Sequence, residues 1–232
     1  MTERPYTLVS CGMSLDGFLD DASDQRLLLS NEADFDRVDA LRARSDAILV
    51  GAATVRNDNP RLLVRSEAYA CVRRNRGLPD QPVKVTVTRR AKLDPGSHFF
   101  TAGDAPRFVY CSTDTVEMAR DGLGSVATVV DAGCPVELGW VCRDLAARGV
   151  RRLLVEGGGE TLTQLLTQGL ADELHLVVAP VFVGDAAATR FVGTGVFPFS
   201  GTRRARLVES RTIGDVVLLR YALSQRFLCE AW

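Results

Sequence analysis

The stretch that decides the fold is Leu153-Leu154-Val155-Glu156-Gly157-Gly158-Gly159-Glu160, in which a short apolar strand leads through three glycines into a helical pattern. Glycine permits positive φ and lets the backbone approach a bound group closely, and the first N–H groups of a helix can bind a phosphate. Ordinary strand-to-helix turns show the same pattern, so the pattern alone is weak evidence for a ligand site.

Short apolar strands alternate with helical patterns on both sides of this stretch. Strands are expected at 6–11, 47–50, 83–88, 107–111, 126–130, 152–155 and 173–178, and the clearest helices at 34–44, 137–148 and 160–168. Such alternation implies crossover connections and a mostly parallel sheet covered on both faces. Segments 206–212 and 216–222 flank the turn signal Ile213-Gly214-Asp215 and predict an antiparallel hairpin at a sheet edge.

Composition points to one soluble enzyme-sized domain over residues 1–232, because 46% hydrophobic residues suffice for a core. The formal net charge of −1 provides no global basic field, so neither nucleic acid nor an anionic membrane is expected as a partner. With no signal region and no apolar run of spanning length, a cytoplasmic location is expected. The six scattered cysteines predict buried, reduced thiols and no metal site.

Residues 66–82 look inserted. The run Arg73-Arg74-Asn75-Arg76 precedes Gly77, Pro79 and Pro82, which is typical of a surface loop or a mobile lid. The plainer interpretation is a solvated basic loop.

A second group of polar residues follows the buried strand that ends at Gly51. Thr54 and Asp58 come before Asn59-Pro60, where the proline stops the turn. In ordinary roles, Thr54 caps a helix and Asp58 forms a turn. Parallel sheets bind ligands at the carboxyl ends of their strands. We therefore expect this segment and the glycine run to form two walls of one cleft.

Taken together, the motifs resemble the pyrimidine reductases of riboflavin biosynthesis, and most closely the free-standing ones. The resemblance extends from residue 5 to about 222 and rests on Met13-Ser14-Leu15-Asp16-Gly17, Leu41-Arg42-Ala43, Asp46 to Gly51, Thr54-Val55, Asp58 to Leu62, Glu156 to Gly159, Ala171-Asp172-Glu173-Leu174 and Ala179-Pro180.

The resemblance implies a dihydrofolate-reductase-like three-layer α/β/α sandwich, a homodimer, and NADPH-dependent reduction of a ribosylaminopyrimidine 5′-phosphate to its ribitylamino product. By the same resemblance, Thr54 and Asp58 lie in the cofactor cleft, and Gly157, Gly158, Gly159 and Glu160 hold the cofactor diphosphate. The implied substrate-binding residues are Arg42, Leu62, Arg65 and Glu156. Asp58 and Glu156 are treated first as orienting or polarising groups, and a general-acid role for either is a hypothesis.

Thr88 and Arg89 lie at the end of the strand 83–88, where an adenosine ribose can be bound. The Arg89 guanidinium suits the 2′-phosphate that distinguishes NADPH from NADH, although a solvated strand end is the ordinary interpretation.

Four positions depart from the family pattern. Phe18 stands where a lysine is common, Leu63 where a threonine is common and Asp39 where a histidine is common. Arg26 stands at a substrate-contact position where a small hydroxyl residue is common. Two alternatives therefore stay open: an NADPH-dependent reductase of another pyrimidine or pteridine, and a non-catalytic nucleotide-binding protein on the same fold.

Overall fold

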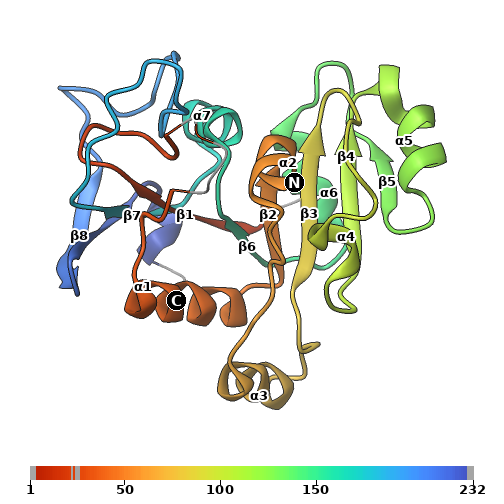
Figure 1. The fold of residues 1–232 in the computed structure, drawn as a ribbon, viewed down its shortest axis with the longest axis horizontal. Helices are drawn as coiled ribbons and strands as arrows, with labels where there is room; N and C mark the ends of the chain where they lie inside the picture. Colours follow the sequence, from red (N-terminus) through yellow and green to blue (C-terminus); the bar gives the residue numbers. More distant parts are fainter. Residues whose placement is uncertain (1–3, 22, 24–26, 229–232) are drawn as a thin grey trace. The chain divides into compact units, whose positions relative to one another are not determined.

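The computed structural model of the protein describes residues 4–21, 23 and 27–228 (Figure 1). Arg26 lies outside the described residues. The chain divides into two compact units built from alternating segments, Met1–Pro5 with Asp39–Leu154, and Tyr6–Val38 with Val155–Trp232. The expectation of a single domain over residues 1–232 stays a prediction.

The first unit contains the strand order β5-β4-β3-β2-β6, and the β5/β4, β4/β3 and β3/β2 pairs are parallel. The bounds are β2 (Ala47–Gly51), β3 (Val83–Thr88), β4 (Arg107–Cys111), β5 (Thr128–Asp131) and β6 (Arg152–Val155). Its helices are α2 (Ala52–Asp58), α3 (Glu67–Asn75), α4 (His98–Thr101), α5 (Val116–Leu123) and α6 (Leu138–Ala147), with a 3₁₀ turn η1 (Thr113–Thr115) before α5. Every residue of β2 is buried, as expected for a strand covered on both faces.

The second unit has the strand order β1-β7-β9-β8, in which β1 (Tyr6–Met13) and β7 (Glu173–Val178) are parallel. The antiparallel hairpin consists of β8 (Arg206–Ile213) and β9 (Val216–Ala222), and its turn places Gly214 at φ 61°. Helix α7 (Gly159–Thr167) and the 3₁₀ turn η2 (Gln225–Leu228) also belong here. The predicted α/β fold with a mostly parallel sheet and a C-terminal hairpin is confirmed.

Helix α1 (Glu32–Arg44) begins in the second unit and ends in the first. The Asn31 side chain accepts a hydrogen bond from the Asp34 backbone N–H at 3.0 Å, so Asn31 caps the helix as predicted. Arg42 and Arg44 lie in the last turn, where cations are favoured by the helix dipole.

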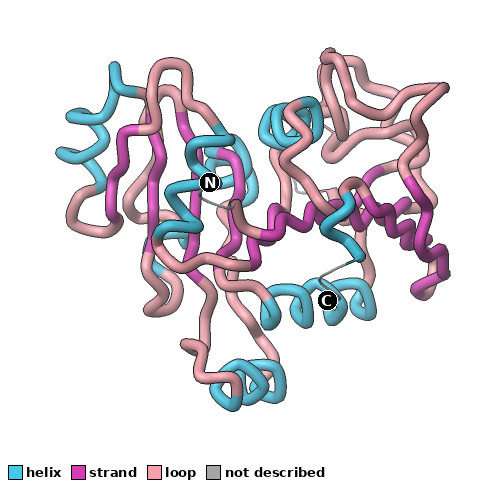
Figure 2. Tube along the Cα trace, turned by 180° about the vertical axis from the view of Figure 1, so that it is seen from behind, coloured by secondary structure: helices cyan, strands magenta, loops and turns pink. Residues whose placement is uncertain are grey.

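Residues 66–82 are not a plain loop, because they contain α3. Figures 1 and 2 show this helix on an excursion of the chain between α2 and β3. Its apolar contacts are few, since Ala70 and Arg73 are its buried residues. Five of its nine residues are apolar, but the arginines at its end and the Gly and Pro residues after it made the segment resemble a loop.

Arg73 is the larger correction, because this side chain is buried and not solvated. Its guanidinium donates to four backbone carbonyls, those of Pro79 (2.6 Å), Ser45 (2.5 Å), Ala43 (3.2 Å) and Arg42 (3.3 Å). Burial lowers the pKa of Arg73 from its usual value, against the attraction of Asp46 and Asp80. Arg73 thus ties α3 to the carboxyl end of α1.

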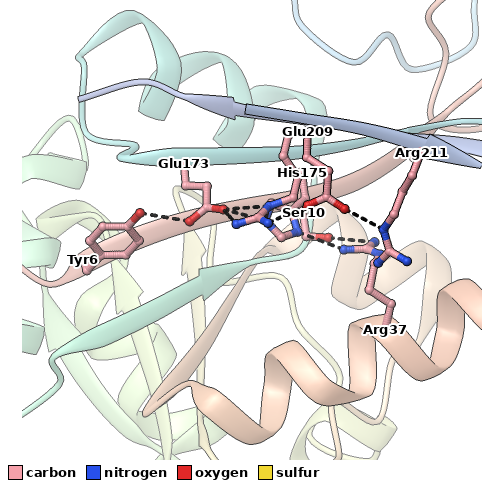
Figure 3. A network of polar contacts seen from close by, with 8 residues as sticks. Tyr6, Ser10, Arg37, Glu173, His175, Glu209 and Arg211 are labelled. Carbon is pink, nitrogen blue, oxygen red and sulfur yellow. Dashed lines mark hydrogen bonds and ion pairs between the residues drawn. The ribbon is translucent and has the colours of Figure 1, made fainter. Parts of the chain in front are cut away.

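A buried polar network links the strands of the second unit to α1 (Figure 3). At its centre, Glu173 Oε2 accepts a hydrogen bond from Tyr6 Oη at 2.9 Å, and Glu173 Oε1 accepts one from Arg220 Nη2 at 2.7 Å. His175 Nε2 lies 2.7 Å from the same Oε1. Burial alone would raise the pKa of Glu173, but hydrogen bonds from His175, Arg220 and Tyr6 outweigh it and hold this pKa below its usual value.

His175 lies between two guanidinium groups and a carboxylate. Arg37 Nη1 lies 3.1 Å from His175 Nδ1, and Arg220 Nε lies 3.0 Å from His175 Nε2, the atom that also contacts Glu173 Oε1. Burial lowers the pKa of His175; Glu173 opposes this shift, while Arg37 and Arg220 add to it.

Five cysteines lie in the described chain, and none of these five is in a disulfide. Cys11, Cys111 and Cys142 are buried, whereas Cys71 and Cys134 are exposed, so the expectation of buried thiols is wrong for these two. No helix in the described ranges is both long and apolar enough to cross a bilayer. The cytoplasmic location stays a prediction.

Candidate active site

Thr54 and Asp58 lie one turn apart on the same face of α2, directly after the buried strand β2. The helix is capped by Gly51, so Thr54 is inside it and is not its cap. Asp58 is its last residue and is exposed, and Asn59 then takes the left-handed conformation that ends the helix. The structure therefore presents a hydroxyl and a carboxylate together at the carboxyl end of a parallel strand.

Arg42 and the segment that begins at Leu62 come together in the same unit. Arg42 Nη1 donates to the Leu63 carbonyl at 3.0 Å. Leu62 is buried and has φ 49°, a conformation that a non-glycine residue rarely adopts and that is enriched at functional sites. Arg65 follows with its side chain 56% exposed. These three predicted substrate-binding residues are thus neighbours.

Thr88 and Arg89 close the strand β3. The Thr88 hydroxyl accepts the Ala91 backbone N–H at 3.1 Å and is buried, so it stabilises the turn after the strand. The Arg89 carbonyl accepts a hydrogen bond from Thr115 at 3.2 Å, and its side chain is exposed. An exposed guanidinium at a strand end is compatible with binding an anion from solvent.

The glycine run forms the entry to α7. Gly157 has φ 136° and Gly158 has φ 89°, and the helix starts at Gly159. A Cβ atom on Gly157 would meet nothing within 4 Å, so open space adjoins the backbone there. Glu156 precedes the run and is partly exposed, and Glu160 lies exposed in the first helical turn.

A pocket of about 460 Å³ opens beside the amino end of α7. It is lined by Gly159, Glu160, Thr163, Gln164, Thr189, Arg190, Gly193 and Thr194. The loop that carries Arg190 packs closely on the helix, because a Cβ atom on Gly159 would lie 2.5 Å from the Arg190 carbonyl oxygen. The N–H groups at the start of α7, the open space at Gly157 and one arginine together fit an anionic group such as a dinucleotide diphosphate.

Arg190 is a site residue that sequence reasoning missed. Its guanidinium lies 4.5 Å from the centroid of the Phe18 ring, and the two residues form an isolated β-bridge. Stacking of this kind is a favourable cation–π contact. The Phe18 ring thus has a cation supplied by a distant loop. No local motif around Arg190 could have revealed this.

The loop at Met13 to Gly17 is fixed by Asp16. Its carboxylate accepts hydrogen bonds from the Ser14 hydroxyl (2.6 Å) and from the backbone N–H groups of Val183 (3.1 Å) and Gly184 (2.8 Å). These bonds, that from Ser14 first, lower the pKa of Asp16 from its usual value. Asp16 therefore holds two loops of the second unit together.

The predicted residues divide between the units. Arg42, Thr54, Asp58, Leu62, Arg65, Thr88 and Arg89 belong to the first, whereas Glu156, Gly157, Gly158, Gly159 and Glu160 belong to the second. That both sets line one cleft stays a prediction.

Solved structures define the class of this fold. The chain matches a pyrimidine reductase-like protein from Corynebacterium diphtheriae with a TM-score of 0.79 at 22% identity, covering 94% of this chain and 91% of that one. It also matches a diaminohydroxyphosphoribosylaminopyrimidine deaminase/5-amino-6-(5-phosphoribosylamino)uracil reductase from Thermotoga maritima with a TM-score of 0.76 at 22% identity, covering 94% of this chain and 56% of the longer one. The fold is that of the pyrimidine reductases.

The sequence itself gives the family. Residues 5–219 match the model of the RibD C-terminal domain. Two relatives named 2,5-diamino-6-ribosylamino-4(3H)-pyrimidinone 5′-phosphate reductase share 38% identity (Archaeoglobus fulgidus, 78% of this chain and 83% of the relative) and 34% identity (Methanothermobacter thermautotrophicus, 95% and 99%). The chain belongs to the RibD C-terminal domain family, which confirms the resemblance drawn from its motifs.

Proposed function

We propose that this protein reduces a ribosylaminopyrimidine 5′-phosphate to the ribitylaminopyrimidine 5′-phosphate with NADPH, as a step of riboflavin biosynthesis. The observation that carries the proposal is the 34% identity to a reductase of this name along 99% of that relative's length. The substrate assignment rests on the relatives' names, and the arrangement of Arg42, Leu62 and Arg65 supports it with two guanidinium groups for a sugar phosphate.

In this proposal each unit contributes one part of the chemistry. Arg42, Leu62 and Arg65 bind the ribosyl phosphate, and Glu156 accepts hydrogen bonds from the N–H edge of the pyrimidine. Thr54 and Asp58 contact the cofactor near its reactive end, and the helix α7 entry with Glu160 holds its diphosphate. When bound, the nicotinamide supplies a hydride.

The hydride acceptor is the former anomeric carbon of the substrate in its open-chain imine form. A C–H bond forms at this carbon, the C=N double bond becomes single, and the nitrogen takes a proton from bound water, Asp58 or Glu156. Orienting two bound partners can contribute roughly 7–11 kcal/mol to barrier reduction, more than the roughly 10²–10⁴-fold acceleration from one positioned acid. Positioning is therefore the main task of these residues.

Cofactor choice gives a direct prediction. An Arg89 contact to the 2′-phosphate of about 1.5–3 kcal/mol favours NADPH over NADH by about 10- to 150-fold. We expect Arg89→Ala to remove most of this preference while leaving kcat/KM with NADH nearly unchanged. Steady-state kinetics with both cofactors measures it, and Arg90→Ala, the exposed neighbour, is the matched control. Equal losses with NADPH and NADH would show that Arg89 supports the fold or the adenine.

We also propose a homodimer that covers the outer part of the C-terminal hairpin. Strand β8 ends the strand order of the described sheet, and Leu207 is 50% exposed, Val208 37% and Val217 37%. An uncovered edge with apolar side chains favours association with a second copy. Sedimentation at micromolar concentration is expected to give a dimer, and a fully active monomer would remove this proposal.

The function itself is tested by anaerobic incubation with NADPH and a small set of candidate substrates. The set contains ribosylaminopyrimidine phosphates and a dihydropteridine, and mass spectrometry identifies the products. We expect reduction of a ribosylaminopyrimidine phosphate alone. Turnover of the pteridine only would favour the alternative reductase, and NADPH binding without any turnover would favour a non-catalytic binding protein.

A further inference from the structure

The segment Leu62–Ser66 is held by side chains from several elements of the first unit. Gln81, at the far end of the inserted residues, makes two hydrogen bonds with the backbone of Val64. Its Oε1 accepts the Val64 N–H at 2.7 Å and its Nε2 donates to the Val64 carbonyl at 3.0 Å. Together with the bond from Arg42 to the Leu63 carbonyl at 3.0 Å, these contacts fix the first half of the segment.

Asp39 fixes the second half. Its Oδ1 accepts the Arg65 backbone N–H at 2.8 Å, and its Oδ2 accepts the Ser66 backbone N–H at 2.8 Å. The same carboxylate lies 3.7 Å from Arg65 Nε as an ion pair. Asp39 therefore contacts both the backbone and the side chain of one predicted substrate ligand.

The environment of Asp39 shows that this carboxylate is committed to the segment. Its side chain is 3% exposed, so its charge is removed from water and must be compensated within the protein. Two backbone N–H groups and one guanidinium provide that compensation, and hydrogen bonds to an ionised acceptor are the stronger kind. The Arg65 side chain, by contrast, is 56% exposed, so Asp39 anchors its base and leaves much of it in contact with solvent.

We infer that Asp39 is a positioning residue that sets Arg65 for the phosphate of the substrate. The inference rests on the proposed function, because it takes Arg65 as a substrate ligand. Asp39 acts through Arg65 and does not touch the substrate. The buried Asp39 carboxylate thus orients the base of the Arg65 side chain.

The first test is Asp39→Asn, which keeps the size of the side chain but replaces one acceptor oxygen by an NH₂ group. We expect KM for the phosphorylated substrate to rise about tenfold, with kcat changed less than about twofold and KM for NADPH unchanged. For the same substrate without its phosphate, KM is expected to stay unchanged. Asp36→Asn, an exposed position on the same helix α1, is the matched control.

A double-mutant cycle separates the inference from the proposed function. We expect Asp39→Asn to add nothing to KM once Arg65→Ala is present. If Arg65→Ala alone leaves KM for the phosphorylated substrate unchanged, the substrate role of Arg65 is wrong. If Arg65→Ala raises KM and folded Asp39→Asn does not, the positioning role of Asp39 is wrong.

A second variant covers the case in which Asp39→Asn does not fold. Ser66→Pro removes one of the two N–H groups that Asp39 accepts, and Ser66 already has φ −76°, which proline can adopt. We expect Ser66→Pro to raise KM for the phosphorylated substrate about threefold, because one of the two backbone hydrogen bonds to Asp39 is lost. An unchanged KM in folded Ser66→Pro would overturn the inference.

Discussion

Glu173→Gln is expected to lower the free energy of unfolding by about 3–5 kcal/mol at pH 7, the usual cost of removing one partner of a buried ion pair. Glu173 is fully buried, and its charge compensates Arg220 while it accepts from Tyr6 and His175. The neutral amide leaves Arg220 with Glu209 as its remaining counter-charge and places an NH₂ group against other buried donors. Denaturant unfolding measures the difference.

Glu209→Gln is the matched control for this prediction. Glu209 also pairs with Arg220, at 2.6 Å, but its side chain is 30% exposed and water screens the pair. We expect a loss of at most about 1 kcal/mol. Equal losses at both positions would contradict the view that burial makes Glu173 the centre of the network in Figure 3.

The same network predicts how stability depends on pH. The folded-state pKa of Glu173 is lowered, so its contribution is present above its unfolded pKa and is lost as pH falls through the folded value. His175 has a folded pKa below its usual 6.5, so the unfolded chain takes up its proton first and stability also falls as pH drops below about 6.5. The wild-type advantage over Glu173→Gln should therefore shrink in acid and stay constant between pH 7 and 8.

Glu156→Gln is expected to reduce kcat/KM by about 10- to 150-fold, which corresponds to about 1.5–3 kcal/mol for a lost charge-assisted hydrogen bond. The reason is that a heterocycle with an N–H edge needs an acceptor, and Glu156 is placed directly after β6 beside the glycine run. Binding of NADPH, measured by titration, should barely change.

Glu160→Gln is the matched comparison in the first turn of α7. We expect Glu160→Gln to change the Kd for NADPH, measured by titration, and to leave KM for the pyrimidine unchanged. If Glu156→Gln instead abolishes NADPH binding while substrate affinity survives, the roles given to the two carboxylates are wrong.

Most of the regular elements follow from local pattern. The buried strand β2 is a short apolar run, β3 alternates valine with lysine and threonine, and α1 carries its cap Asn31 in the sequence. Their positions therefore follow from the sequence to within a residue or two. Helix α3 was missed because its stability depends on Arg73, whose partners are backbone carbonyls that leave no trace in composition.

The residues of the candidate site also fall into two groups, those that local motifs predict and those that depend on tertiary contacts. The glycine run and the pair Thr54 and Asp58 are local motifs and were visible in the sequence. Asp39 and Arg190 act on segments far away along the chain, through backbone N–H groups and through a ring. Contacts of that kind depend on tertiary structure, so one sequence read alone does not reveal them.

The most direct test of the proposed reaction follows the hydride itself. NADPH that carries deuterium at both C4 positions of the nicotinamide is incubated with the protein and a ribosylaminopyrimidine 5′-phosphate, and the product is analysed by NMR and mass spectrometry. We predict that deuterium is found at C1′ of a new ribityl chain and that the pyrimidine ring stays unlabelled. Label in the heterocycle, or oxidation of NADPH without transfer to the sugar carbon, would contradict the proposed reaction.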